Sequence, residues 1–313
     1  MTDGADQEPL LGVVGTTASG KTSLAVALCH AAARRGASWE VLSLDSMLVY
    51  RGLDLGTAKP DADERAGVPH HLIDLVEPEA RFDVSAYLDA ARAAESACRG
   101  RGAVPLYAGG TAFYLKALLS GLFEGPPVDL DVRARLEAAY ADEGPAALHA
   151  RLASGDPELA ARLHPNDRKR VLRGLEVLEQ TGEPLSRLQA QWEGAPRPAR
   201  LVGLEHPPEV LDARILARTE AMVAAGWPAE AAALRERLGP TAAAALGYAE
   251  VLRHVDGELT EAEAIEAVAL RTRQFARRQR TWLRRFDVRW WPAPVDGDGL
   301  AALADEVLDH LLA

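Results

Sequence analysis

The sequence predicts an α/β fold: a parallel sheet wrapped by helices, carrying a phosphate-binding loop (P-loop) and interrupted by an all-helical insertion domain. Apolar segments of strand length alternate with segments of helical periodicity in the first 124 residues. The first of these strands runs directly into a glycine-rich loop and a helix. Only helical patterns occupy residues 125–198, between two stretches rich in proline and glycine. The expected domains are therefore a P-loop core formed by residues 1–124 and 199–313, and an insertion at 125–198.

Composition restricts the class of protein. The chain has 313 residues, 48% of them hydrophobic, which suffices for one large domain or two. A net charge of −11 argues against a uniformly basic nucleic-acid-binding coat, although local basic patches are compatible with it. Cys29 and Cys98 show neither metal-binding nor disulfide spacing, so we expect core thiols in a reducing compartment. We find no signal peptide and no apolar run that could cross a bilayer, and expect a cytoplasmic monomer without membrane contact.

The glycine-rich loop is the clearest functional signal. Leu10–Val14 is typical of a buried strand, and the spacing G-x-x-x-x-G-K-T follows it. Glycines let backbone N–H groups approach phosphate oxygens, and the start of the next helix adds a favourable dipole. Lys21 would reach the terminal phosphates, and the Thr22 hydroxyl would hold Mg²⁺. The alternative is an ordinary glycine turn, but the Lys-Thr pair favours a site for a di- or triphosphate. The loop comprises Gly15, Thr16, Thr17, Ala18, Ser19, Gly20, Lys21 and Thr22.

A carboxylate follows the second predicted strand. Trp39–Leu44 has strand character and ends at Asp45. Ligands of open α/β sheets bind at the carboxyl ends of the strands, so Asp45 is a candidate functional residue, although it could instead only cap the turn. The third predicted strand, Ala103–Tyr107, is followed by glycines rather than by the acid that many P-loop ATPases use to hold Mg²⁺.

Other segments indicate structure rather than chemistry. His70 and His71 are adjacent on an extended segment and would point to opposite faces, so they make a poor joint metal site. We expect helices over 82–99, 112–119 and 296–313, the last closing the core. Leu201–Leu204 is predicted to return the chain to the sheet.

Two basic patches stand out against the acidic background. In the insertion, Pro165–Asp167 predicts a helix start and Gly182 its end. Arg168–Arg170 and Arg173 crowd the first two turns of that helix, where its dipole disfavours cations. A bound anion would offset this repulsion. The alternative is a solvated charged face.

The second patch, Arg271–Arg285, holds seven arginines and no acid, with Phe275 and Trp282 among them. Arginine with interleaved aromatics suits phosphate contacts and base stacking. The alternative is a solvated helix opposed by acidic neighbours such as Glu261, Glu263 and Glu266. Arg214 and Arg218 lie one turn apart on another predicted helix.

Six motifs occur in order over nearly the whole chain: GTTASGKT, LDSMLVYRGLDLGTAKP, VPHHLID, AGGTAFYLKALLSGL, HPNDRKRVLRGLEV and TRQFARRQRTWLRR. Together and in this order they resemble the bacterial type of the tRNA dimethylallyltransferase family. The resemblance implies transfer of a dimethylallyl group from dimethylallyl diphosphate to the exocyclic N6 amine of an adenine. That adenine is 3′-adjacent to the anticodon in tRNAs reading codons that begin with U. The products would be isopentenyladenosine and diphosphate.

The resemblance also implies residue roles. Asp45 would be the general base, Thr111 would touch the reacting region, and the P-loop with Mg²⁺ would bind the diphosphate, aided by Arg214 or Arg218. The insertion would grip the anticodon stem of the tRNA. The residues implied to contact tRNA are Asp45, Ser46, Met47, Leu48, Thr111, Arg133, Lys169, Arg170, Val171, Leu172, Arg173, Arg277, Arg278, Gln279, Arg280, Thr281, Trp282, Leu283 and Arg284.

Some residues depart from the family pattern. Thr16 replaces a proline, Met47-Leu48 stands where many members have Arg-Gln, and Ala242–Gly247 lacks an arginine found in some members. Two other functions remain open at this point. A P-loop small-molecule kinase would use Asp45 to activate a hydroxyl, but would not need the basic stretch Arg271–Arg285. A non-catalytic RNA-binding NTPase would not need a carboxylate beside the loop.

Overall fold

The computed structural model describes residues 8–122, 125–190, 196–294 and 297–313. The chain divides into two compact units, Met1–Leu119 with Arg197–Ala313, and Ser120–Pro196. The second unit begins five residues before the predicted insertion and ends two residues before its predicted end. Of the residues in the predicted tail helix, Asp296 lies outside the described residues.

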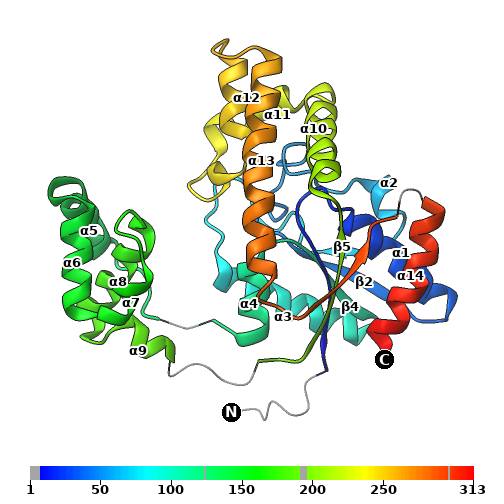
Figure 1. The fold of residues 1–313 in the computed structure, drawn as a ribbon, viewed down its shortest axis with the longest axis horizontal. Helices are drawn as coiled ribbons and strands as arrows, with labels where there is room; N and C mark the ends of the chain where they lie inside the picture. The colour runs from blue at the N-terminus through cyan, green and yellow to red at the C-terminus, as the bar shows by residue number, and fades with distance from the viewer. Residues whose placement is uncertain (1–7, 123–124, 191–195, 295–296) are drawn as a thin grey trace. The chain divides into compact units, whose positions relative to one another are not determined.

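A six-stranded sheet in the order β3-β2-β4-β1-β5-β6 forms the centre of the first unit (Figure 1). Every pairing is parallel, which confirms the predicted sheet. The predicted return strand is β5, and it pairs with β1. Two strands were not predicted: β3 has two residues, and β6 lies at the edge of the sheet. The strands are β1 (Leu10–Val14), β2 (Trp39–Leu44), β3 (His70–His71), β4 (Val104–Gly109), β5 (Ala199–Glu205) and β6 (Val288–Pro292).

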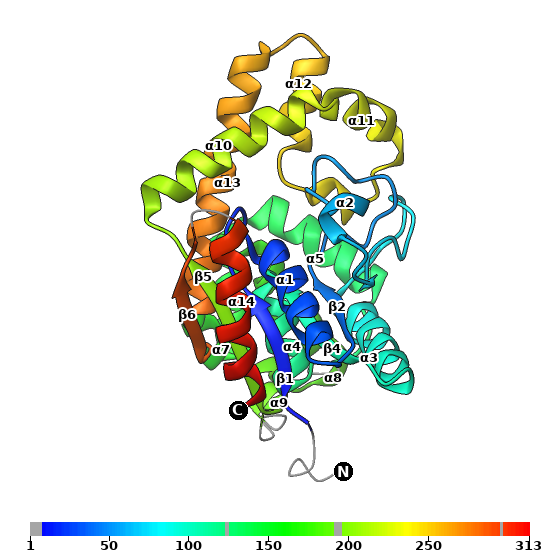
Figure 2. The ribbon, with the colours of Figure 1, turned by 90° about the vertical axis from the view of Figure 1, so that its right-hand side faces the viewer.

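Helices bury both faces of the sheet. In β1, Leu10 and Val14 belong to one core cluster, whereas Leu11 and Val13 belong to the other, as alternation along a strand requires. The helices α1 (Lys21–Arg34) and α14 (Gly297–Leu312) lie side by side over the second of these faces (Figure 2). The tail helix therefore closes the core, as predicted. On the other face pack α3 (Val84–Gly100) and α4 (Ala112–Ser120).

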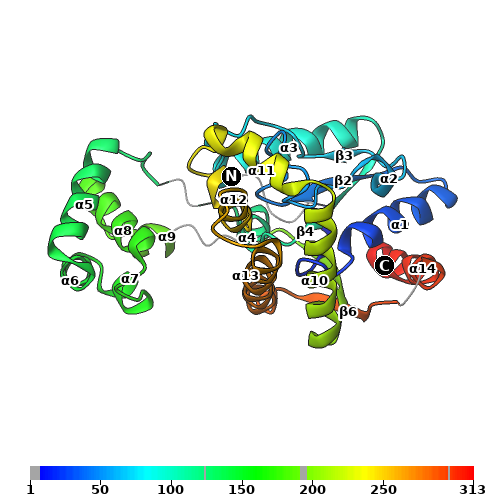
Figure 3. The same ribbon diagram turned by 90° about the horizontal axis from the view of Figure 1, so that it is seen from above.

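Four helices follow β5 and precede β6. They are α10 (Pro208–Ala224), α11 (Trp227–Leu234), α12 (Tyr248–Val255) and α13 (Glu261–Leu283), with short 3₁₀ turns at Arg235–Arg237 and Ala242–Ala244. Figure 3 shows α10 and α13 side by side, and their contact buries Leu211 and Ile215 against Ala269 and Ala276. The short helix α2 (Ala62–Arg65) lies in the loop between β2 and β3. These segments surround the end of the sheet where β1 meets α1.

In its described part, the second unit is built from helices. They are α5 (Leu130–Glu143), α6 (Pro145–Gly155), α7 (Pro157–Arg162), α8 (Arg168–Thr181) and α9 (Leu185–Ala190). The Asp167 side chain caps α8, and Gly182 ends it with a left-handed φ of 73°, which confirms the predicted start and end. No described helix in either unit is both long and apolar enough to cross a membrane.

Candidate phosphate and acceptor site

The glycine-rich loop connects β1 to the first residue of α1. Gly20 precedes the helix with a φ of 87°, a conformation that glycine adopts without strain. A Cβ added at Gly15 would come within 2.7 Å of the Ser19 hydroxyl oxygen, so the loop closes tightly on itself. The first N–H groups of a helix have no acceptors within that helix. The loop and the start of α1 are therefore suited to an anion.

Lys21 and Arg218 bring positive charge to the same site as Asp45. The Lys21 Nζ lies 3.3 Å from the carbonyl oxygen of Thr16. Burial lowers the pKa of Lys21 from 10.5 to about 8; Asp45 counteracts this, and Arg218 adds to it. Burial also lowers the pKa of Arg218, again counteracted by Asp45. An anion bound here would relieve the mutual repulsion of the two cations.

Asp45 both caps its turn and faces the site. Its Oδ1 accepts a hydrogen bond of 2.8 Å from the backbone N–H of Met47. The turn-capping alternative is therefore correct for one oxygen. Oδ2 has no hydrogen-bond donor among the residues that the structure describes. The cap fixes the carboxylate in place and leaves one oxygen available to a ligand.

Both arginines of α10 contact the P-loop. The Nε of Arg214 donates to the carbonyl oxygen of Ala18 at 2.8 Å, and Arg218 donates to the Thr17 hydroxyl. Only Arg218 of the two also lines the cavity that contains Asp45. Arg218 is therefore the better candidate for a direct contact with a bound diphosphate, whereas Arg214 supports the loop backbone.

A cavity of about 480 Å³ lies beside the P-loop. It brings together Thr17, Asp45, Thr111 and Arg218, which come from four separate segments of the chain. Its wall is partly apolar and partly cationic, and includes Met47, Met222, Trp227, Leu246, Phe275, Arg271 and Arg278. The predicted phosphate loop, candidate base and part of the basic stretch therefore share one cavity.

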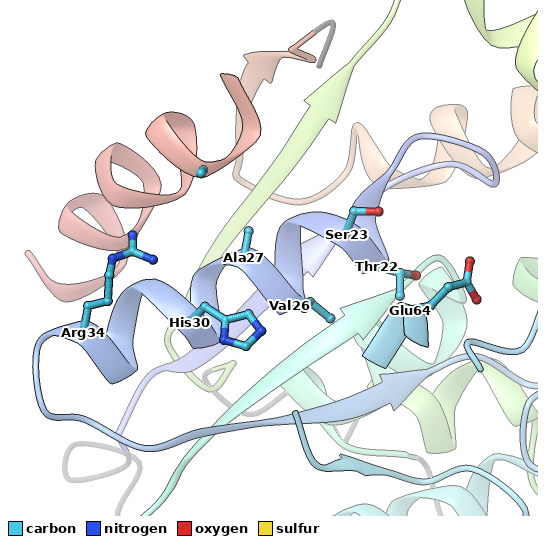
Figure 4. Close-up of a pocket in the computed structure, with 8 residues that line it drawn as sticks. Thr22, Ser23, Val26, Ala27, His30, Arg34 and Glu64 are labelled. Atoms are coloured by element: carbon cyan, nitrogen blue, oxygen red, sulfur yellow. The ribbon is translucent and has the colours of Figure 1, made fainter. Parts of the chain in front are cut away.

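Thr22, the predicted Mg²⁺ ligand, lies in the first turn of α1. Its side chain lines a groove of about 320 Å³ along that helix, together with Ser23, His30, Arg34 and Glu64 (Figure 4). Hydroxyl and carboxylate oxygens suit Mg²⁺. Thr22 and Glu64 offer oxygens of this kind, and they line this groove rather than the cavity that contains Asp45.

Gln279 lies on the buried face of α13. Its side chain is buried; Oε1 accepts from the backbone N–H of Thr17 at 2.8 Å, and Nε2 donates to the carbonyl oxygen of Gly110 at 3.0 Å. Gln279 therefore ties α13 to the P-loop and to the turn that carries Thr111. The resemblance implies tRNA contacts at Gln279 and Leu283, and in this structure both side chains are buried.

The remaining arginines of α13 are available to a ligand. Arg277, Arg278 and Arg284 are exposed, as is Thr281, while Arg280 and Trp282 are half-buried. Arg280 and Arg284 line a small cavity of about 80 Å³ behind the P-loop. Within the described residues, no ion pair is formed by Arg277, Arg278, Arg280 or Arg284. Acidic neighbours therefore do not neutralise the charges of these four arginines. Arg271, in the same stretch, does pair with Glu250.

The basic residues of the insertion are largely neutralised by the unit itself. Arg133 and Arg173 both pair with the fully buried carboxylate of Glu176. Arg170 pairs with the capping residue Asp167 at 3.0 Å. Acidic residues of the same unit thus offset part of the positive charge at the start of α8, whereas Lys169 has no ion-pair partner among the described residues.

The other residues of the insertion that are implied to contact tRNA differ in exposure. Val171 and Leu172 are buried in the core of the unit, so their side chains are not available to RNA. Lys169 is exposed. A helix presents only one face to solvent, so a contiguous run of five residues includes some that face inward.

The two adjacent histidines have separate partners. His70 Nδ1 lies 2.9 Å from the carbonyl oxygen of Val68, whereas His71 Nε2 lies 2.6 Å from Glu40 Oε2. Arg101 and Cys98 also donate to Glu40, and the bond from Arg101 is the main cause that lowers the pKa of Glu40 to about 2. This cluster lies near the amino end of β2, away from Asp45, and links β2, β3 and α3.

The fold and the site define a P-loop α/β protein whose phosphate loop borders a cavity with a carboxylate and arginines. A family model described as IPP transferase matches residues 48–286. The chain is 47% identical to a tRNA dimethylallyltransferase of Kineococcus radiotolerans, over 98% of each chain. The chain belongs to the IPP transferase family, as its motifs predicted, and this favours a transferase over a small-molecule kinase.

Solved structures agree with this assignment. The full-length tRNA isopentenylpyrophosphate transferase from Bacillus halodurans matches with a TM-score of 0.68 and 37% identity, covering 98% of this chain and 97% of that one. A eukaryotic dimethylallyltransferase acting on tRNA matches with a TM-score of 0.78 and 26% identity, covering 92% of this chain and 75% of that one.

The structure adds residues that the sequence did not suggest. Trp227, Met222 and Gly56 line the cavity, and Gln279 supports it. Phe275 was identified only as an aromatic within the basic stretch. Helical periodicity could have indicated that Gln279 faces inward with Ala276 and Leu283, but its partners, Thr17 and Gly110, are too far away in the sequence to be inferred.

Replacing Gln279 by Leu is predicted to weaken binding of inorganic diphosphate about tenfold, because the buried Thr17 N–H and Gly110 C=O would lose their partner, at a cost of about 1–3 kcal/mol. Isothermal titration calorimetry measures this. Gln189→Leu removes the same amide from an exposed position on α9, which contributes no residue to the cavity that contains Asp45, and should leave diphosphate affinity unchanged. Equal affinities for both variants would contradict the supporting role of Gln279.

Diphosphate binding should also depend on the protonation of Lys21. Because the pKa of Lys21 is lowered to about 8, the free protein loses this positive charge as pH rises through that value. Affinity for inorganic diphosphate should therefore decrease above about pH 8 in the wild type. The ligand itself titrates in this range, so Lys21→Arg, which stays charged, isolates the contribution of Lys21. Parallel pH profiles for the two proteins would refute this assignment.

Proposed function

We propose that this protein transfers a dimethylallyl group from dimethylallyl diphosphate to the N6 amine of an adenine in tRNA. The target is the adenine 3′-adjacent to the anticodon in tRNAs reading codons that begin with U, and the products are isopentenyladenosine and diphosphate. Family membership supports this proposal. The observation that carries it is that Asp45, Thr111, Arg218 and the P-loop residue Thr17 line one cavity.

The P-loop side of the cavity suits the leaving group. As the allylic C–O bond breaks, negative charge develops on the diphosphate, and preorganised N–H groups and cations stabilise it. In this chain those groups are the start of α1, Lys21 and Arg218. Thr22 would hold Mg²⁺, with Glu64 beside it, and the ion would neutralise further charge on the diphosphate. ATP, which carries the same phosphate groups, is a candidate competitor for the loop.

The Asp45 side suits the acceptor amine. The lone pair of an adenine amine is delocalised into the ring, so the amine is a weak nucleophile. A carboxylate that accepts its proton as the new N–C bond forms contributes about 10²–10⁴-fold, the usual range for general base catalysis. Asp45 keeps one oxygen without a hydrogen-bond donor among the described residues, and Thr111 lines the same cavity. The target base must leave its stack to enter.

The exposed arginines of α13 suit the tRNA backbone. Arg277, Arg278 and Arg284 are exposed, and Arg278 lies over the ring of Phe275, 6.0 Å from its centroid. Arginine near an aromatic ring at a cavity wall suits phosphate contacts and stacking on a base. In the insertion, the exposed Lys169 and Arg170 would contact the anticodon stem.

The cellular setting is also part of the proposal. Cys29 and Cys98 are free and buried, which suits a reducing compartment such as the cytoplasm. We propose that the protein acts there as a monomer, without membrane contact. Sedimentation equilibrium of the purified protein tests the oligomeric state.

Asp45→Asn should abolish most turnover and leave the binding of tRNA and of diphosphate unchanged. The wild type, incubated with radiolabelled dimethylallyl diphosphate, Mg²⁺ and unmodified tRNA, should place label in acid-precipitable RNA. Asparagine preserves the cap on Met47 but accepts no proton, so the rate should fall about 10²–10⁴-fold. Filter binding of tRNA and calorimetry with diphosphate should be unchanged. A wild-type rate in this variant would exclude Asp45 as the base.

Arg277→Ala should weaken tRNA binding and leave diphosphate binding unchanged. Loss of one phosphate contact should reduce the slope of log K against log salt by about one. Arg92→Ala is a matched control, because Arg92 is an exposed arginine on α3 whose partner is Asp89. If both variants bind tRNA like the wild type at each salt concentration, α13 does not contact the tRNA backbone at this position.

A further inference from the structure

The carboxylate of Glu230 on α11 receives four hydrogen bonds. Its Oε2 accepts from the backbone N–H groups of Asp54 and Leu55, at 3.1 and 2.7 Å. Its Oε1 accepts from the N–H of Gly56 at 3.0 Å and from the Tyr248 hydroxyl at 2.6 Å. Three consecutive N–H groups converging on one anion form a nest, a common anion-binding arrangement of backbone. Here the chain supplies the anion itself.

This arrangement suits a carboxylate. Its two oxygens together accept the three backbone N–H bonds and the bond from the Tyr248 hydroxyl. Burial, and next the bond to Glu230, raises the pKa of Tyr248 above its usual value, so the phenol keeps its proton and stays a donor. An amide in place of the carboxylate would direct an NH₂ group at two donors.

The clamped segment forms one wall of the acceptor cavity. Gly56, Thr57 and Ala58 line the cavity that also contains Asp45. A Cβ added at Gly56 would overlap the indole nitrogen of Trp227 and would come within 2.5 Å of Tyr248 Cε2. The loop thus packs closely against α11 and α12, and only glycine permits this approach.

The same segment is anchored on its other side. The Thr57 hydroxyl donates to the carbonyl oxygen of Leu53 at 2.6 Å, and the Lys59 ammonium donates to that of Tyr50 at 2.7 Å. Lys59 also pairs with Asp74 at 2.5 Å. These bonds fix the ends of the loop, whereas Glu230 fixes its middle, where the cavity lies.

We propose that Glu230 is a positioning residue for the acceptor: it holds residues 54–58 as a preformed wall against which the substrate base is placed. This inference rests on the proposed function. Glu230 does not line the cavity itself and acts through the loop. Its loss should therefore affect the acceptor tRNA and spare the diphosphate donor, whose P-loop contacts lie elsewhere.

Glu230→Gln tests the proposal. Hydrogen exchange at the amides of residues 54–56 should become faster, because one carboxamide oxygen cannot serve four donors. The KM for tRNA should rise about tenfold, within the effect expected of a small misplacement of a binding surface. The KM for dimethylallyl diphosphate should match that of Glu236→Gln, which removes a charge from an exposed position nearby.

Tyr248→Phe provides a graded comparison, since it removes one of the four donors and leaves the three backbone bonds. Its KM for tRNA should lie between those of the wild type and Glu230→Gln. Faster exchange with an unchanged KM for tRNA would overturn the positioning role. Equal losses for both substrates together with a lower thermal midpoint would also overturn it, because they would indicate a purely structural role.

The proposed function has its own test, independent of Glu230: it is wrong if the wild type transfers no label to tRNA. Exchange in Glu230→Gln then still tests the clamp without any substrate. Faster exchange at residues 54–56 would support the clamp, and unchanged exchange would overturn it.

Discussion

The structure depends on holding the glycine-rich loop in position before α1, because the N–H groups in the first turn of a helix have no acceptors within that helix. A loop that offers free donors cannot stabilise itself with them, so other segments must hold it. Arg214 and His206 donate to the carbonyl oxygens of Ala18 and Ser19, and Gln279 accepts from the N–H of Thr17. These side chains come from the C-terminal part of the core. The helices between β5 and β6 therefore complete the phosphate loop as well as the cavity.

Charge is distributed so that cations concentrate where a ligand would bind. The chain carries a net charge of −11, and most arginines with an acidic neighbour lie away from the cavity. Lys21 and Arg218 instead lose solvation beside the loop, which lowers the pKa of each. In the insertion, Arg133 and Arg173 pair with Glu176 of the same unit. Sequence alone cannot distinguish arginines that are available to a ligand from arginines that pair within the protein, because both kinds occur in basic stretches.

The sequence predicted well what local pattern determines. The β1–loop–α1 unit, Asp45 at the end of β2, the return strand β5 and the ends of α8 all follow from short stretches of chain. It missed β3 and β6, because two residues and an edge position leave little pattern. It also took contiguous motifs as contact surfaces. Gln279 faces inward within one of them, and its partner Thr17 lies 262 residues away.

Two backbone segments border the same cavity, the P-loop through Thr17 and the segment 54–56 through Gly56, and they differ in the source of the anion. The P-loop has no carboxylate of its own chain on its N–H groups within the described residues, and cations surround it. The segment 54–56 is filled by Glu230. Under the proposed function, the P-loop must release its diphosphate in each cycle, whereas a segment that only shapes a wall is best closed by a permanent anion. The same backbone device can therefore bind a substrate at one side of a cavity and hold the cavity's shape at the other.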